Sequence, residues 1–246
     1  MDLVAGIARW FLDPAHWQGS AGVPTRLGEH VLLCAVALLI AALIGLPAGI
    51  YVGHTGRGAN LAVNLANLGR ALPTLAVMGI VVPVTAAIDP QLGFKVYPAL
   101  IGLVVLAIPP ILVNAYAAIS GVDRDIVEAG RGMGMRPREL LARVEVPIAL
   151  PVIVGGIRSA AAQIIATATL AAIFGGPGLG RYLVEGYAQF DYPMMFAGVI
   201  LVGVVFVAEE AAFALIQRRL TSPGVLQVRA EDLARMEARL GAGGEA

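Results

Sequence analysis

Hydrophobic residues in this chain gather in five long blocks, which are separated by shorter polar or charged intervals. A helix needs about 20 predominantly apolar residues to cross the hydrocarbon core of a bilayer. Each block is long enough to do so. We therefore predict an all-α integral membrane protein with about five transmembrane helices, at residues 31–53, 58–88, 96–119, 152–174 and 194–216.

These blocks divide the chain into three parts. Residues 1–29 are mixed in character and predict a short interfacial helix, with Trp10 and Trp17 at the depth of the lipid headgroups. Residues 30–220 form the expected transmembrane domain, which includes a charged interval at 120–150. Residues 221–246 are polar and predict a tail with a weak amphipathic helix.

Two of the blocks contain helix breakers. A proline inside a helix removes a backbone hydrogen bond and kinks the helix. We therefore expect one helix over residues 58–88 that is broken near Pro73, and a second break at Pro109-Pro110 in the third block.

Asparagines recur at helical spacing in the second block, at positions 60, 64 and 67, and an arginine follows them. Polar side chains at this depth face protein or water rather than lipid. Two interpretations stay open: the asparagines join helices through hydrogen bonds, or they line the path of a solute. The path residues of the second interpretation are Asn64, Asn67, Arg70, Pro73, Pro109 and Pro110.

The composition supports a membrane protein. The 246 residues are 58% hydrophobic and 14% charged, with a mean hydropathy of +0.81, whereas soluble domains are about 45–50% apolar and about 25% charged. The formal net charge is zero, so the overall charge implies no nucleic-acid partner. Cys34 is the only cysteine and forms neither an internal disulfide nor a zinc site.

The sequence carries no catalytic or metal-binding constellation. Its three histidines flank the first block at no metal-ligand spacing, and no nucleophile motif occurs. The run GGPGLG at residues 175–180 lacks the Lys and Ser/Thr that end a phosphate loop, so we interpret it as a tight extracellular turn. The chain is therefore not expected to be an enzyme, and a partner or an ion gradient must supply any energy.

The charged interval reads as two short helices joined by an elbow. The first helix begins at Asp123 and breaks at Gly132 and Gly134, and the second begins near Pro137, where proline suits a first helical turn. Arginines and glutamates alternate through Glu128–Pro151, and Pro147 and Pro151 separate the interval from the fourth block. Such a projection at a membrane surface can dock into a groove of a soluble partner.

This spacing resembles the cytoplasmic coupling loop of ABC-importer permeases, whose signature is E-A-A, three residues, G, nine residues and I-x-L-P. Residues 128–130 stand in the place of E-A-A, Gly134 falls on the glycine, and residues 144–147 fall on I-x-L-P. Gly130 replaces the second alanine, which loosens the first helix by up to ~1 kcal/mol. The resemblance implies contact with a separate ATPase through Glu128, Ala129, Gly130, Gly134, Arg136 and Pro147.

Residues 31–220 as a whole are similar to permeases for glycine betaine, carnitine, choline and proline-like osmoprotectants. The runs that carry this likeness are NLANLGRALPTLA, IPPILVNAYAAISGVD, VEVPIALPVIVGGIR and IFGGPGLG. The resemblance implies the ABC type I importer permease (MetI-like) fold and a second permease copy or paralogue. It also implies ATPase subunits that bind ATP and Mg, and an extracytoplasmic solute-binding protein. Three further functions stay open: a methionine or sulfonate permease, which would share much of this layout, an ion-coupled secondary transporter, and a non-transporting scaffold.

The distribution of arginines predicts the orientation. With five spans, Arg57, the arginines of the charged interval and those of the C-terminal tail fall on the same side. Because basic loops stay in the cytoplasm, we expect an outside N-terminus, and a charged interval and C-terminus inside a bacterial or archaeal cell.

Arg158 lies near the inner end of the fourth block, and Glu209 and Glu210 lie near the inner end of the fifth. An isolated charge at that depth is costly, which predicts an ion pair between Arg158 and one of the two glutamates. The second interpretation is that the charged groups extend to the interface separately.

Overall fold

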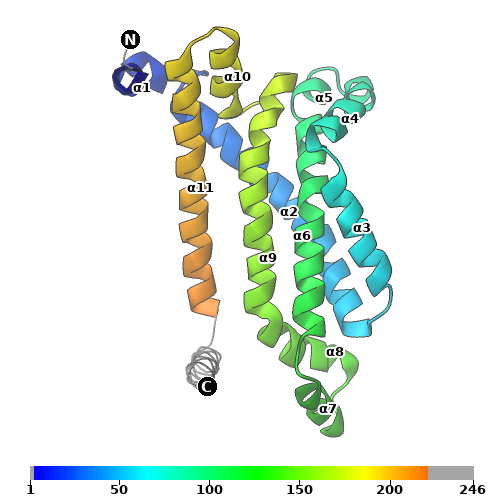
Figure 1. Cartoon of the computed structure of the whole chain (residues 1–246). Coiled ribbons are helices and arrows are strands. Elements are labelled where there is room, and N and C mark those ends of the chain that lie inside the picture. Colours follow the sequence, from blue (N-terminus) through cyan, green and yellow to red (C-terminus); the bar gives the residue numbers. More distant parts are fainter. Residues whose placement is uncertain (1–2, 221–246) are drawn as a thin grey trace, which may run out of the picture.

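The computed structural model describes residues 3–220, apart from the side chain of Arg70, and every regular element in this part of the chain is a helix (Figure 1). The predicted all-α class is confirmed, while the predicted tail at 221–246 lies outside the described residues. The elements are α1 (Leu3–Leu12), η1 (Pro14–Trp17), α2 (Val23–Thr55), α3 (Ala59–Ala71), α4 (Thr74–Ile88), α5 (Leu92–Lys95), α6 (Tyr97–Ser120), α7 (Arg124–Gly132), α8 (Pro137–Leu140), the π-helical turn η2 (Leu141–Glu145), α9 (Val146–Thr167), η3 (Ala168–Phe174), α10 (Gly180–Ala188) and α11 (Tyr192–Leu220).

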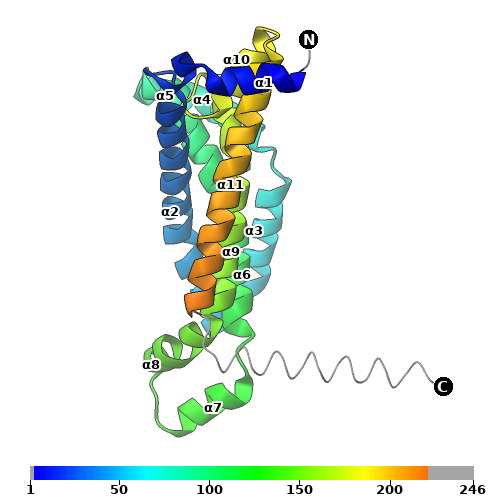
Figure 2. The same ribbon diagram turned by 90° about the vertical axis from the view of Figure 1, so that its left-hand side faces the viewer.

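The molecule is an elongated bundle in which α2, α6, α9 and α11 run along the long axis (Figures 1 and 2). One end carries α1, α5 and α10, and the opposite end carries α7 and α8 (Figure 1). Among the described residues, 4 helices are long and apolar enough to cross a membrane, and the bent pair α3–α4 makes up to 5. The predicted number of spans is thereby confirmed.

Helix α2 begins at Val23, earlier than the predicted start of the first span. Pro24 lies in its first turn, where no backbone hydrogen bond is lost. The charges of this turn pair with each other, since Arg26 lies 2.9 Å from the Glu29 carboxylate. His30 is fully buried, and its Nε2 lies 3.2 Å from the Ile165 carbonyl oxygen of α9. The helix therefore includes these charged residues and begins before the apolar block that predicted the first span.

The break expected near Pro73 is confirmed, and it divides the second span into two separate helices. Helices α3 and α4 meet at Leu72-Pro73 with an angle of 88° between 59–69 and 74–88. Leu72 has ψ 124° and Pro73 has ψ 115°, so both residues are extended. Proline disfavours the helical conformation of the residue before it and donates no hydrogen bond, so the chain turns at this point.

The expected break at Pro109-Pro110 is wrong, because α6 continues through both prolines. Both are buried in the bundle. A Cβ atom on Gly69 of α3 would lie 2.8 Å from Cγ of Pro109, so a glycine faces this ring. The Asn114 side chain donates a hydrogen bond of 2.7 Å to the Pro110 carbonyl. Packing against neighbouring helices holds α6 together where sequence alone predicts a kink.

Glycines bring the central helices together. Along α2, Gly45, Gly49 and Gly53 recur every four residues and face α6. A Cβ atom at Gly49 would lie 2.5 Å from the Leu112 carbonyl oxygen. On α9, a Cβ atom at Gly156 would lie 2.5 Å from Cβ of Asn114. Small residues let helix backbones approach closely in a membrane, where packing replaces the hydrophobic driving force. Helices α2, α6 and α9 therefore form one closely packed layer.

Candidate functional site

The charged interval lies at the end of the bundle opposite α1 and α10 (Figures 1 and 2). Asp123 caps α7 by accepting a 2.9 Å hydrogen bond from the Asp125 N–H. Gly134 has φ +83°, a left-handed conformation that favours glycine. Helix α8 then begins with Pro137. The predicted helix, elbow and second helix are confirmed.

The two halves of this projection pack together where α7 has a glycine. Leu140 of α8 is 1% exposed, and a Cβ atom on Gly130 would lie 2.7 Å from its Cδ1 atom. An alanine methyl at Gly130 would displace the leucine. The departure from the E-A-A pattern therefore has a local structural reason, which is close packing of Leu140 on α7.

The remaining residues of the implied coupling set face outward. The residues of this set that are exposed in the described chain are Glu128, Ala129, Gly134, Arg136 and Pro147. The Arg136 backbone N–H donates a 3.1 Å hydrogen bond to Glu139, which fixes the start of α8 and leaves the arginine side chain exposed. A protruding surface of charged and small residues is thus available to a partner.

The predicted separation at Pro147 and Pro151 does not occur, because α8 passes through η2 directly into α9. In the π-helical turn η2, the Val146 N–H reaches back to the Leu141 carbonyl. This wider turn precedes Pro147, which has no N–H to donate. Helix α8, the second half of the projection, is therefore continuous with the α9 span over residues 137–174.

Glu145, the last residue of η2, is 5% exposed and contacts a helix that is distant in sequence. Its Oε2 atom lies 2.6 Å from Nδ1 of His54, near the end of α2. A carboxylate only accepts, so the imidazole donates. A cavity of about 450 Å³ adjoins this pair, and it is also lined by Tyr116, Arg124, Glu128 and Arg131.

The asparagine stripe faces outward from α3. Asn64 and Asn67 are exposed in the single chain, together with Leu61, Leu65 and Leu68. Pro73 is exposed at the bend, whereas Pro109 and Pro110 are buried against other helices. The Arg70 side chain lies outside the described structure. The five path residues whose side chains the structure describes are therefore divided among the outer face of α3, the bend that follows it and the interior of the bundle.

The structure brings Arg158 of α9 to Glu210 of α11. The arginine Nε donates to both carboxylate oxygens, at 3.0 and 3.1 Å, and its NH1 group lies 3.0 Å from Oε1 of Gln217. Glu209 is placed differently: both carboxylate oxygens are buried and have no hydrogen-bond partner among residues 3–220. It lines an apolar cavity of about 510 Å³ between α2, α9 and α11.

The opposite end of the molecule is held by the GGPGLG turn. Gly175 and Gly178 have φ +73° and +104°, and the Gly178 N–H donates to Glu29 of α2 at 2.9 Å. The Tyr182 hydroxyl donates to the Ala21 carbonyl at 2.7 Å. Burial raises the pKa of the Tyr182 phenol, so this hydroxyl stays protonated and keeps its bond. The run is a structural turn.

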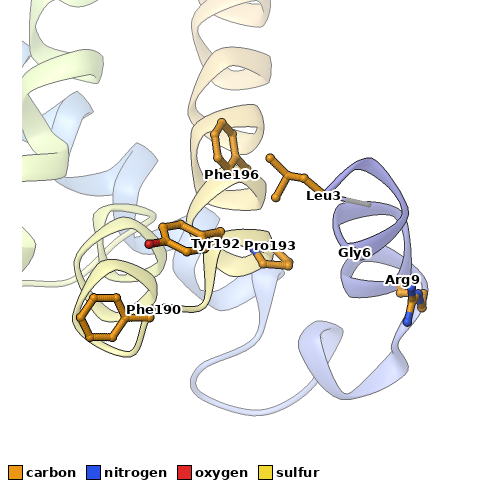
Figure 3. Close-up of a pocket in the computed structure, with 7 residues that line it drawn as sticks. All are labelled: Leu3, Gly6, Arg9, Phe190, Tyr192, Pro193 and Phe196. Atoms are coloured by element: carbon orange, nitrogen blue, oxygen red, sulfur yellow. The ribbon is translucent and has the colours of Figure 1, made fainter. Parts of the chain in front are cut away.

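Beside this turn, α1 packs on the start of α11 and borders a cavity of about 570 Å³ (Figure 3). A Cβ atom on Gly6 would lie 2.9 Å from Cγ of Pro193, so the two helices touch there. Phe190 and Tyr192 point to one side of this contact, and Arg9 lies on the other (Figure 3). The groups do not converge on a common centre.

Sequence reasoning missed His54, Glu145 and Gln217 as contact residues. His54 was one of three histidines without metal spacing, and Glu145 occupied the variable position of I-x-L-P. His54 and Glu145 contact each other although 91 residues separate them in sequence, and Gln217 contacts Arg158 across 59 residues. No local pattern signals such pairs. Among residues 3–220, no group of three His, Cys, Asp or Glu side chains is placed to hold a metal ion.

Comparisons with known proteins give a consistent result. Residues 45–222 match the family described as "Binding-protein-dependent transport system inner membrane component". The chain is 31% identical over 201 residues to the choline transport system permease protein OpuBB of Bacillus subtilis, covering 82% of this chain and 89% of the relative. It is 32% identical over 216 residues to the osmoprotectant import permease protein OsmW of Salmonella typhimurium, covering 87% and 100%.

The fold also has solved counterparts. A chain of the MetNI methionine ABC transporter in an inward-facing conformation superposes with a TM-score of 0.73 at 22% identity, covering 85% of this chain and 99% of the other. At that identity the likeness concerns the fold, which is the one expected for a MetI-like permease.

Proposed function

The chain belongs to the family of binding-protein-dependent transport system inner membrane components, and we propose that it carries quaternary-amine osmoprotectants such as glycine betaine, choline or carnitine across the membrane. Family membership makes it a multi-pass permease subunit of an ABC importer.

The observation that carries the transport mechanism is the projection formed by α7 and α8. It is helical and exposed, its second half is continuous with α9, and it matches the coupling-loop signature in register. A partner that moves this projection moves α9 with it, because no break separates them. The chain itself has no Walker motif, so ATP and Mg belong on a partner ATPase.

The choice of solute rests on the relatives. OpuBB is named for choline, and a further Bacillus subtilis relative at 30% identity is named for glycine betaine, carnitine and choline. OsmW is named for osmoprotectants. Both OpuBB and OsmW align over most of their own length, so the likeness covers the whole permease rather than the coupling loop alone.

The proposed assembly contains two permease copies or paralogues, ATPase subunits on the α7–α8 side, and a solute-binding protein on the α1–α10 side. The N-terminus is outside and the C-terminus is cytoplasmic. Arg57 and the projecting arginines support this orientation because basic segments remain in the cytoplasm. Exposed Asn64 and Asn67 on α3 then face the second permease or the solute path between the two.

The test is reconstitution of the purified permease with its ATPase and binding protein in liposomes that contain ATP. Radiolabelled glycine betaine, choline and carnitine are offered outside, with methionine and a sulfonate as competing solutes. We expect ATP-dependent accumulation of a quaternary amine that methionine does not inhibit. Uptake of methionine instead would contradict the solute assignment.

A second measurement separates this proposal from an ion-coupled transporter. Uptake in the liposomes is compared with and without a protonophore, at constant internal ATP. An ABC importer keeps transporting, whereas a proton-coupled carrier stops. Co-purification of an ATPase with the tagged permease is the matching biochemical observation, and its absence would count against the proposed assembly.

A further inference from the structure

The His54–Glu145 contact joins the projection to a helix that does not flank it in sequence. Glu145 ends η2, which leads into α9, while His54 is the penultimate residue of α2. The His54 side chain is 16% exposed and the Glu145 side chain is 6% exposed, and 2.6 Å separates His54 Nδ1 from Glu145 Oε2. This is the single side-chain hydrogen bond that the described structure places between α2 and the 120–150 interval.

Because Glu145 is largely buried, its hydrogen bond to His54 is costly to break. Glu145 is 5% exposed, and it lines the cavity beside this pair together with the apolar Ile119 and Val122 and the charged Arg124 and Arg131. A carboxylate in such surroundings is unfavourable unless it is hydrogen-bonded. Breaking the contact therefore leaves a largely buried carboxylate without the one side-chain hydrogen bond that the described structure gives it.

The His54–Glu145 pair lies beside a close contact between α2 and α6. A Cβ atom on Gly53, next to His54, would lie 2.7 Å from Cβ of Ile119 in α6. Gly45 and Gly49 continue this close contact along α2. The end of α2 is therefore closely packed on α6 beside the His54–Glu145 contact. The cavity of about 450 Å³ beside the pair separates α2 from Glu128 and Arg131 of α7.

We propose that His54 and Glu145 are positioning residues that carry the movement of the α7–α8 projection directly into α2. The inference rests on the proposed importer function and adds a route to it. The partner's stroke reaches α9 through the continuous chain, and it reaches α2 through this hydrogen bond. The two helices on either side of α6 then move together instead of in sequence.

The test uses the reconstituted complex and measures the number of solute molecules imported per ATP hydrolysed. His54→Leu removes the donor, and a buried hydrogen bond to a charged group is worth enough to change an equilibrium by about tenfold or more. We expect the solute-to-ATP ratio to fall about tenfold while ATP hydrolysis and co-purification of the ATPase persist. His54→Gln keeps a donor and is expected to recover most of the ratio.

Arg57→Ala is the matched control, since Arg57 is exposed at the same end of α2 and its side chain makes no contact that the described structure records. It should leave the ratio unchanged. If His54→Leu does not assemble, Glu145→Gln and His54→Gln supply the comparison, and the exchanged pair His54→Glu with Glu145→His should restore coupling relative to either single change. A wild-type ratio in an assembled His54→Leu or Glu145→Gln complex would overturn the proposal.

The proposed function fails in a different way. If the wild-type complex neither imports solute nor hydrolyses ATP, the importer assignment is wrong before any variant is compared. If the wild type works and the His54 variants lose hydrolysis in proportion to import, the pair supports assembly alone and the inference about coupling is overturned.

Discussion

Gly134 shows how a single backbone conformation shapes the projection. Its φ of +83° is open to glycine and disfavoured for residues with a Cβ atom. No heavy atom lies within 4 Å of the place a Cβ would take. The effect of substitution there is therefore conformational strain, and steric crowding plays no part.

Gly134→Val is expected to reduce import strongly, since left-handed backbone strain costs about 1–3 kcal/mol and valine adopts it poorly. Gly134→Asn is the matched control, because asparagine tolerates this conformation. Import and ATPase co-purification are measured for both. Equal import by the valine variant and the wild type would show that the elbow does not need the left-handed conformation.

The arginine of α9 illustrates a second effect at the scale of single residues, which is the pairing of a charge inside a span. Arg158 bonds Glu210 and Gln217 on α11. We expect Glu210→Gln to lower the melting temperature of the purified protein, and we expect Arg158→Glu combined with Glu210→Arg to restore part of it. A Glu210→Gln variant as stable as the wild type would mean that the pair contributes nothing measurable.

At the scale of elements, the glycines of α2 differ in how closely they approach α6. Gly49 meets Leu112 and Ala115, whereas Gly28, on the same helix, has no heavy atom within 4 Å of the position that a methyl group would take. Helix propensity favours alanine at both positions. At Gly49 the steric clash outweighs the higher helix propensity of alanine, whereas at Gly28 there is no clash and propensity alone applies.

Gly49→Ala is expected to destabilise the purified permease by about 1–3 kcal/mol because a methyl group overpacks the interface. Gly28→Ala should be neutral or stabilise it by about 0.5–1 kcal/mol. Thermal or denaturant unfolding in the same detergent measures both. A stabilised Gly49→Ala variant would show that the α2–α6 contact relaxes easily.

Local signals explain which elements were predictable. Proline at 137, the cap at Asp123 and glycine at 134 act within a few residues, so the helix-elbow-helix of the projection followed from sequence. The apolar blocks likewise gave the spans. Pro109-Pro110 failed as a predicted break because packing on Gly69 and neighbouring helices overrides a local preference.

What covers the predicted path residues likewise depends on more than local sequence. Asn64 and Asn67 face outward from one chain, so periodicity found the correct stripe but not what covers it. His54 and Glu145 escaped notice because 91 residues separate them. Pairings of this kind depend on how α2 and α9 pack on α6, and single-sequence periodicity contains no such information.

For the whole molecule, the packing falls into a central layer and two outer parts. Helices α2, α6 and α9 are closely packed, whereas α11 buries only Ala197 and Gly198 among its described residues. The apolar faces of α3, α4 and α11 remain exposed in the single chain. Lipid or further subunits cover them in a membrane.

The orientation of the whole chain is testable by thiol labelling. In a Cys34→Ala background, the chain has no other cysteine. Arg136→Cys on the projection and Tyr187→Cys, which is 71% exposed at the other end, report the two sides. We expect a membrane-impermeant maleimide added to intact cells to label position 187 and to leave position 136 unlabelled until the membrane is opened. The reverse result would place the projection outside and remove any contact with an ATPase.

The right-angled meeting of α3 and α4 has a consequence for the lipid around it. The end of one helix and the start of the next leave backbone carbonyl and amide groups without intrahelical partners, and Pro73 supplies no N–H of its own. Acyl chains cannot hydrogen-bond such groups. We therefore expect water or the polar surface of a neighbouring subunit, rather than acyl chains, to lie against Leu72 and Pro73.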